Sequence, residues 1–177
     1  MNKINMTWGV AIVLILLAVT TRFLPHPPNF TAIGAMGLFG GAYFSKQRWA
    51  YFIPFAALLL SDLVLNYFVY HVEFSSYCLS SYVPFALVFL AGKVMLDKVN
   101  PQNVIIASLT ASSIFFLVSN AVCWQIDPTY SKDFAGLMMS YAAGIPFFGN
   151  TLASDLLYSG LFFGTFAWLP KFEYSSI

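Results

Sequence analysis

Residues 24–44 read LPHPPNFTAIGAMGLFGGAYF, and this stretch contains the features from which the fold is predicted. Its first part is rigid, because prolines at positions 25, 27 and 28 fix the backbone and remove amide donors. These prolines surround two polar side chains, His26 and Asn29, immediately before an apolar run. We therefore expect a rigid loop that fixes the position of both side chains.

The second part of the stretch is an apolar helix with small residues along one side. The residues of this face are Gly34, Gly37, Gly40 and Gly41. Small faces allow helices in membranes to approach one another closely. The face is therefore predicted to be a packing or docking surface, and its partner is either a neighbouring span or another subunit.

The composition is that of a membrane protein. Of 177 residues, 59% are hydrophobic and 8% are charged, and the mean hydropathy is +0.76. About a quarter of the residues of a soluble domain are charged, and a short soluble chain could not bury so much apolar surface. The net charge of +1 excludes a basic surface for nucleic acid. Residues 1–177 are predicted to form a single all-α transmembrane domain.

The apolar runs predict six membrane-spanning helices, since a span needs about 20 apolar residues and continuous runs do not suit a barrel. The expected spans are Thr7–Phe23, Phe30–Phe44, Trp49–Tyr70, Ser81–Leu96, Val104–Trp124 and Gly149–Leu169. The first could be a signal peptide, but Ala18-Val19-Thr20 is a poor cleavage site and further spans follow, which favours an uncleaved helix.

The basic residues predict the orientation. Six spans place the following residues on one side: Lys3, Lys46, Arg48, Lys93, Lys98 and Lys171. The other side has only Arg22 and Lys132. The positive-inside rule therefore places both termini in the cytoplasm, with the chain in the bacterial inner membrane.

The connection before the last span contains a predicted surface helix. Ser131 could cap it, Phe134, Leu137, Met138 and Tyr141 give it an apolar stripe, and Gly144 and Pro146 are expected to end it. Such a helix either rests on the membrane or forms a lid over a pocket.

Polar residues from distant parts of the chain are predicted to meet in the outer third of the bundle. They are Arg22, His26, Asn29, Asp62, Asn66, Asn120, Trp124, Tyr141, Asn150 and Asp155. Ionisable side chains are costly inside a membrane and are therefore rarely incidental. Two interpretations are compatible: ion pairs and hydrogen bonds that hold the helices together, or a ligand pocket open to the outside.

The sequence contains no motif for catalysis or for a bound cofactor. HExxH, P-loop, GxSxG and CxxC patterns are absent, so we expect neither an enzyme nor ATP hydrolysis by this chain. His26, His71 and Glu73 are a weak metal signal, and no metal is predicted. Cys78 and Cys123 are both expected to face outward, either as a disulfide or as free thiols.

Four strings carry a family resemblance: RFLPHPPNFTAIGAMGLFGGAYF, SDLVLNYF, LVSNAVCW and AAGIPFFGNTLASDLLY. They resemble a family of small bacterial membrane proteins assigned to transport, which is similar in turn to the substrate-binding (S) components of energy-coupling-factor importers. That resemblance implies six spans, cytoplasmic termini and an outward-facing pocket capped by three loops. The Ala-x-x-x-Ala docking patch of many S components is missing, since Ala11 and Ala18 are seven residues apart.

The leading hypothesis is a substrate-binding membrane component of a nutrient or vitamin importer, which would work with an energy-coupling membrane subunit and ATPases. Arg22 is expected to hold an anionic group, the carboxylates to accept hydrogen bonds, and Trp124 and Tyr141 to stack on a ring. The alternative is a structural or assembly subunit of a larger membrane complex, with the glycine face as a docking surface.

Overall fold

The computed structural model describes residues 3–45, 51–71 and 79–168, and this part of the chain is entirely helical. The elements are α1 (Lys3–Thr21), α2 (Ile33–Tyr43), α3 (Phe52–Val64), the π-helical segment η1 (Leu65–Tyr70), α4 (Leu79–Met95), α5 (Pro101–Ile126) and α6 (Phe134–Trp168). The all-α class is therefore confirmed.

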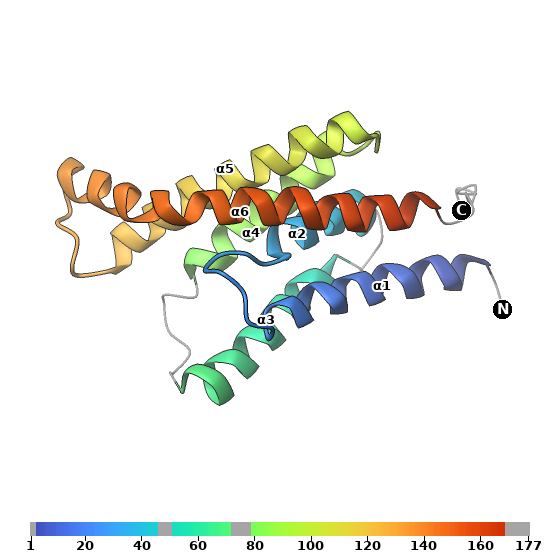
Figure 1. The fold of residues 1–177 in the computed structure, drawn as a ribbon, viewed down its shortest axis with the longest axis horizontal. Coiled ribbons are helices and arrows are strands. Elements are labelled where there is room, and N and C mark those ends of the chain that lie inside the picture. The colour runs from blue at the N-terminus through green and yellow to red at the C-terminus, as the bar shows by residue number, and fades with distance from the viewer. Residues whose placement is uncertain (1–2, 46–50, 72–78, 169–177) are drawn as a thin grey trace.

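The helices form two groups (Figure 1). Helices α2, α4, α5 and α6 pack extensively on one another, and α2 lies inside this group with Ile33 to Ala42 buried. Helices α1 and α3 lie side by side below it in the view, and they make only limited contact with the rest. The N-terminal end of α1 and the C-terminal end of α6 lie at the same end of the molecule.

The glycines of α2 explain why this helix is central. A Cβ at Gly41 would collide with the backbone carbonyl of Phe89 in α4, and a Cβ at Gly92 of α4 would collide with the backbone of Leu38. The two backbones are therefore closer than any larger residue would permit. Gly37 faces side chains of α4 and Gly40 faces α3, so the glycine face packs against neighbouring helices of the same chain.

Aromatic side chains close the other side of α2. The ring of Phe39 is fully buried, and it lies 6.0 Å from the ring of Phe162, 5.4 Å from Phe163 and 5.3 Å from Phe166. Such edge-on aromatic pairs add to the free energy of apolar burial. The helix is thus held by glycine contacts on one side and aromatic contacts with α6 on the other.

The structure does not confirm the predicted number of six spans. Two helices in the described part are long and apolar enough to cross a membrane, Phe52–Tyr70 and Pro101–Ile126. Shorter apolar helices cover Gly9–Thr21, Ile33–Tyr43 and Ser80–Met95. Composition and length by themselves therefore support membrane association for two helices, not for six.

The predicted separate surface helix is wrong. Helix α6 runs without a break for 35 residues, through both Gly144 and Pro146, so no independent span begins at Gly149. Gly144 is a packing residue rather than a stop, since a Cβ there would collide with the side chain of Asn120. Asp133, rather than Ser131, accepts the hydrogen bond of the first turn, from the amide of Gly136 at 2.8 Å.

Candidate functional site

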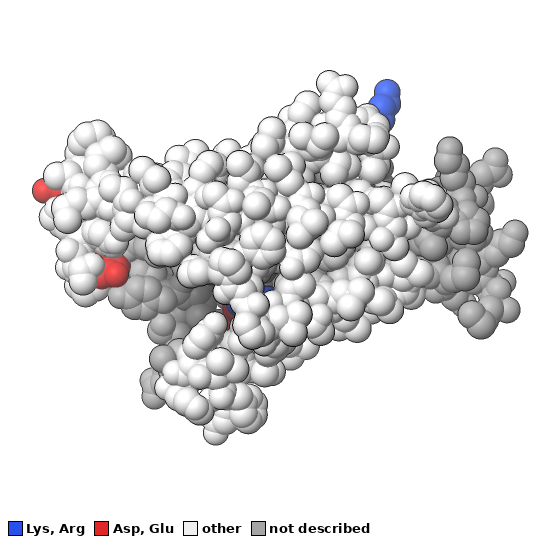
Figure 2. Space-filling view, in the orientation of Figure 1, with Lys and Arg blue, Asp and Glu red and all other residues white. Residues whose placement is uncertain are grey.

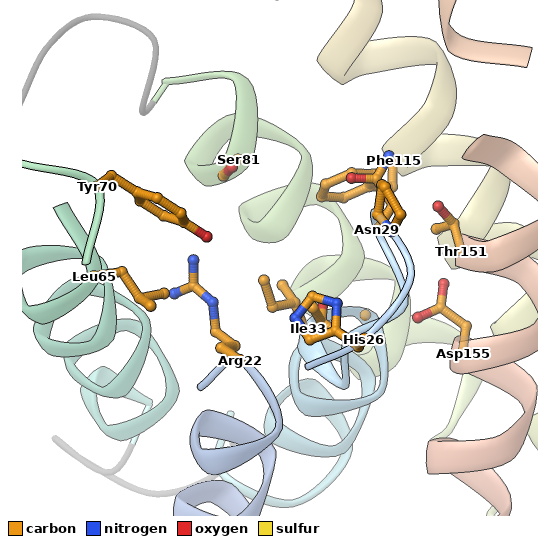
Figure 3. A pocket seen from close by; sticks show the side chains of 13 residues that line it. Arg22, His26, Asn29, Ile33, Leu65, Tyr70, Ser81, Phe115, Thr151 and Asp155 are labelled. Atoms are coloured by element: carbon orange, nitrogen blue, oxygen red, sulfur yellow. The ribbon is translucent and has the colours of Figure 1, made fainter. Parts of the chain in front are cut away.

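The described chain encloses a cavity of about 310 Å³, which we name the Arg22 cavity. Its walls come from the end of α1, the α1–α2 loop, the start of α2, η1 and the start of α4, with α5 and α6 opposite. Figure 3 shows Arg22 and Asp155 on opposite sides of it. A second cavity of about 340 Å³, the Asn120 cavity, shares Asn29, Ser81, Phe115 and Thr151 with the first. The two cavities therefore share part of their walls.

Charged groups are rare on the face of the molecule seen in Figure 2. They lie at the ends of the helix bundle and in one recess, and the long sides of the bundle are uncharged. Large apolar side chains such as Leu60, Val94 and Leu161 are exposed. Among the described residues, the charged side chains that are buried or largely buried are Arg22, Asp62 and Asp155.

Arg22 already has a partner of opposite charge. One guanidinium nitrogen forms an ion pair with Asp62 of α3, and another donates to the hydroxyl of Ser61. Both side chains of the pair are largely buried, at 13% and 8% exposed. Arg22 lines the Arg22 cavity, whereas Asp62 lies behind it, outside the residues that line either cavity. The pair connects α1 to α3 and compensates the charge of Arg22.

Asp155 is the other charged group at the cavity, and no cationic side chain of the described residues forms an ion pair with it. The residue is 1% exposed, and the Ser112 hydroxyl lies 2.7 Å from Oδ2. The same hydroxyl lies 3.1 Å from the carbonyl of Ser108. Gly34 makes room for this carboxyl group, because a Cβ there would overlap it.

The α1–α2 loop lies across the cavity and is held at several points. Asn29 has a φ of 62°, a left-handed conformation that asparagine tolerates better than most residues. Nδ2 of Asn150 in α6 donates to the carbonyl of Pro28 at 2.9 Å. Nδ1 of His26 lies 2.9 Å from the carbonyl of Pro27, and His26 and Asn29 both line the cavity. Asn150 therefore holds the loop rather than lining the cavity.

The aromatic residues predicted to stack on a ligand hold the α5–α6 connection instead. Nε1 of Trp124 donates to the carbonyl of Ser131 at 2.8 Å, and the hydroxyl of Tyr141 donates to the carbonyl of Leu117 at 3.1 Å. Neither residue lines a cavity. Phe115 lines both cavities, Tyr70 lines the Arg22 cavity, and the other aromatic residues of the Asn120 cavity are Phe116, Tyr130, Phe147 and Phe148.

The same connection is ordered by its carboxylates. Hydrogen bonds from the amide and hydroxyl of Thr129 hold the pKa of Asp127 below its usual value. The amide of Gly136 and the hydroxyl of Ser131 lower the pKa of Asp133 in the same way. Both carboxylates are therefore stable as anions at the surface.

The structure thus separates the predicted residues into groups. Arg22, His26, Asn29 and Asp155 line the Arg22 cavity, and Asn29 and Asn120 line the Asn120 cavity. Asn66 belongs to η1 and lines neither. The cavity residues that the sequence interpretation did not select include Thr31, Leu65, Tyr70, Ser81, Phe115 and Thr151.

Ser112, the partner of Asp155, was also missed. Ser108 and Ser112 are one turn apart on α5, and both are fully buried. A pair of small hydroxyls spaced in this way in an apolar helix was the signal that could have identified this face.

No metal site is apparent: in residues 3–45, 51–71 and 79–168 no three His, Cys, Asp or Glu side chains gather. Glu73 and Cys78 lie outside the described residues. The weak metal signal at Glu73 and the choice between a Cys78–Cys123 disulfide and free thiols therefore stay predictions.

The comparisons with known proteins place the chain in a family. Residues 2–177 match the family described as "Family of unknown function (DUF6580)", and the chain belongs to it. No curated protein and no solved structure matches the chain. The description of the family assigns no activity, so the function has to be argued from the site.

Proposed function

We propose that this chain is the membrane-embedded substrate-binding component of a nutrient importer, with its cavity open to the extracytoplasmic side. The observation that carries the proposal is the convergence of Arg22, Asn29 and Asp155 on a cavity inside an apolar helical bundle. A cavity of a few hundred Å³ with a few convergent polar groups is typical of a small-molecule site.

The distribution of polar residues on α6 supports membrane insertion of this helix. Its buried residues include Thr151, Ser154, Asp155 and Ser159, whereas Ile145, Leu157 and Leu161 are exposed. A soluble helix has the opposite arrangement, with polar residues outward. The internal polar residues lower the mean hydropathy of α6, although the face that would meet lipid is apolar.

The short length of α2 also fits a membrane bundle. Its 11 residues span about 16 Å, well below the roughly 30 Å of a hydrocarbon core. Non-helical backbone at membrane depth is tolerated where protein surrounds it. Since α2 is enclosed by α4, α5 and α6, the loop before it can enter the membrane without contacting lipid. We therefore propose that all six helices belong to one transmembrane domain.

The orientation and partners follow the sequence argument. The excess of lysine and arginine on one side places both termini in the cytoplasm. Uptake then requires an energy-coupling membrane subunit and ATPases, as the resemblance to S components implies. Ala11 and Ala18 are buried, so the docking surface for such partners lies elsewhere on the chain.

The alternative of an assembly subunit has less support. It relied on the glycine face as a docking surface, and all four of these glycines are buried against neighbouring helices of the same chain. An assembly subunit also has no need of a polar cavity with a charged group at each side.

Ligand-induced thermal stabilisation tests the proposal. The full chain, purified in detergent, is heated with each member of a panel of vitamins, nucleosides, amino acids and amines. A ligand that binds only the folded state raises the unfolding temperature by mass action. We expect at least one hit that Phe115→Ala weakens and that the lipid-side control Leu161→Ala leaves unchanged. Absence of any hit, or hits that Phe115→Ala does not weaken, would contradict the proposal.

A further inference from the structure

The two charged groups of the Arg22 cavity are not equivalent. Arg22 has Asp62 as its counter-ion and the hydroxyl of Ser61 as a further acceptor. Asp62 already neutralises the guanidinium charge, and a ligand anion that displaced Asp62 would leave this buried carboxylate without its partner. Removing one member of a buried ion pair is strongly unfavourable, so Arg22 is poorly suited to bind a ligand anion.

Asp155 presents the opposite situation. Its only hydrogen-bond partner among the described residues is the Ser112 hydroxyl, which touches Oδ2. An ionised carboxylate has about four acceptor positions. The neighbouring hydroxyls do not fill them: Thr151 donates to the carbonyl of Phe147 at 3.3 Å, and Ser154 donates to the carbonyl of Thr151 at 2.9 Å. Asp155 lines the cavity, although only 1% of the residue is exposed to solvent.

Other groups of the cavity wall can also accept hydrogen bonds from a ligand. Asn29 contributes an amide, and His26 lies with Nδ1 against the carbonyl of Pro27, which leaves Nε2 for another partner. Phe115 offers an aromatic ring, which attracts a cation as well as a planar group. Among the described residues that line the Arg22 cavity, Arg22 is compensated by Asp62, and Asp155 is the one carboxylate without a cationic counter-ion.

We propose that the ligand of this cavity carries a cationic nitrogen group, an ammonium or an amidinium, which donates hydrogen bonds to Asp155. This inference rests on the proposed function and specifies its substrate class. It replaces the sequence-based expectation that Arg22 holds an anionic group. Arg22, paired with Asp62, then lies on the opposite side of the cavity and does not contact the charged group of the ligand.

The test uses the nutrient panel extended by two matched series. The first is tryptamine, tryptophol and indole-3-acetate, and the second is benzylamine, benzyl alcohol and benzoate. Members of a series share their ring and differ in the charge of the polar group. Dissociation constants are measured by equilibrium dialysis for every compound that stabilises the full chain in detergent.

We expect the binders to carry a protonated nitrogen, and the cationic member of a bound series to bind at least about tenfold tighter than its neutral analogue, because hydrogen bonds to charged groups are the strong ones. Asp155→Asn keeps the size of the side chain, and it should abolish this preference. Asp133→Asn is the control, since Asp133 lies outside both cavities and asparagine caps a helix equally well.

The outcomes separate the two proposals. Binders that are anionic, or that are neutral with no preference for the amine, would overturn the inference and leave the importer function standing. A preference for amines that survives in Asp155→Asn would also overturn it. A panel without any binder would overturn both. If Asp155→Asn does not fold, the comparison within each series in the unaltered chain still decides.

Discussion

The two helix groups of this protein are packed in different ways. In the group of α2, α4, α5 and α6, the backbones of α2 and α4 touch at Gly41 and Gly92, and α5 and α6 lie together along most of their length. The pair α1 and α3 makes fewer contacts with this group, and it is joined by buried apolar side chains such as Ile15 and Leu58 and by the ion pair between Arg22 and Asp62. Packing thus holds one group, and a charge pair contributes strongly to the other.

The cavity lies where the two groups meet, and this position is instructive. Arg22 comes from the loosely packed pair, and Asp155 comes from the tightly packed group. Segments with few buried contacts open at lower free energy than tightly packed ones. The cavity therefore has one firm wall and one wall that can adjust to a ligand.

The largest loss of stability is expected at the backbone contact between α2 and α4. Gly41→Val should destabilise the protein by at least about 3 kcal/mol, because the new side chain would overlap the carbonyl of Phe89. The measurement is the yield and thermal midpoint of monodisperse protein in detergent. Gly160→Val is the matched control, since nothing lies within 4 Å of a Cβ at Gly160. Equal behaviour of the two variants would show that α2 and α4 are not in backbone contact.

The second-largest loss of stability is expected in the pair of helices α1 and α3. Asp62→Asn leaves Arg22 without its counter-ion and should cost about 3 kcal/mol, at the lower end for a buried pair because both side chains keep some exposure. Hydrogen exchange should rise in α1 and α3 and change little in α4 to α6. The double variant Arg22→Met, Asp62→Leu should recover most of the loss. An increase of exchange that is uniform over all helices would contradict the division into two groups.

A smaller effect is expected where α2 meets the cavity. Gly34→Ala should displace the carboxyl group of Asp155 and cost about 1–3 kcal/mol, since overpacking forces the neighbour to move. Any ligand that binds beside Asp155 should also bind more weakly. Gly149→Ala, at a glycine with nothing within 4 Å, should leave both the thermal midpoint and the affinity unchanged. Tighter ligand binding by Gly34→Ala would show that the ligand does not bind beside Asp155.

The smallest effect is expected at the loop above the cavity. Asn150→Ala removes the donor to the carbonyl of Pro28, and it should cost about 1 kcal/mol. Hydrogen exchange at residues 26–32 should become faster while α6 stays protected. Unchanged exchange in this loop would show that Asn150 does not hold it in place.

Part of this arrangement could be predicted from the sequence because local rules determine it. The glycine spacing of α2 predicted a close helix contact, and the prolines before it predicted a loop of fixed shape. The alternating direction of the predicted spans placed Arg22, Asn29 and Asp155 at the same end of the helix bundle. In the structure these three residues line one cavity.

The features that could not be predicted from the sequence depend on contacts between helices. Pro146 was interpreted as a helix end, yet α6 continues through it, since the backbone hydrogen bond lost at a proline can kink a helix without ending it. The pairing of Arg22 with Asp62 was one of several possible partnerships, and spacing along the chain could not choose among them. The hydroxyl of Ser112 reaches Asp155 only because α5 and α6 pack side by side.

An experimental structure of the full chain in a lipid nanodisc, with a panel hit bound, tests the central claim most directly. The account predicts ligand density in the Arg22 cavity, against Asp155 and beneath Asn29, with lipid around the outer face of α6. Density for the ligand elsewhere, or Asp155 turned towards lipid, would contradict it.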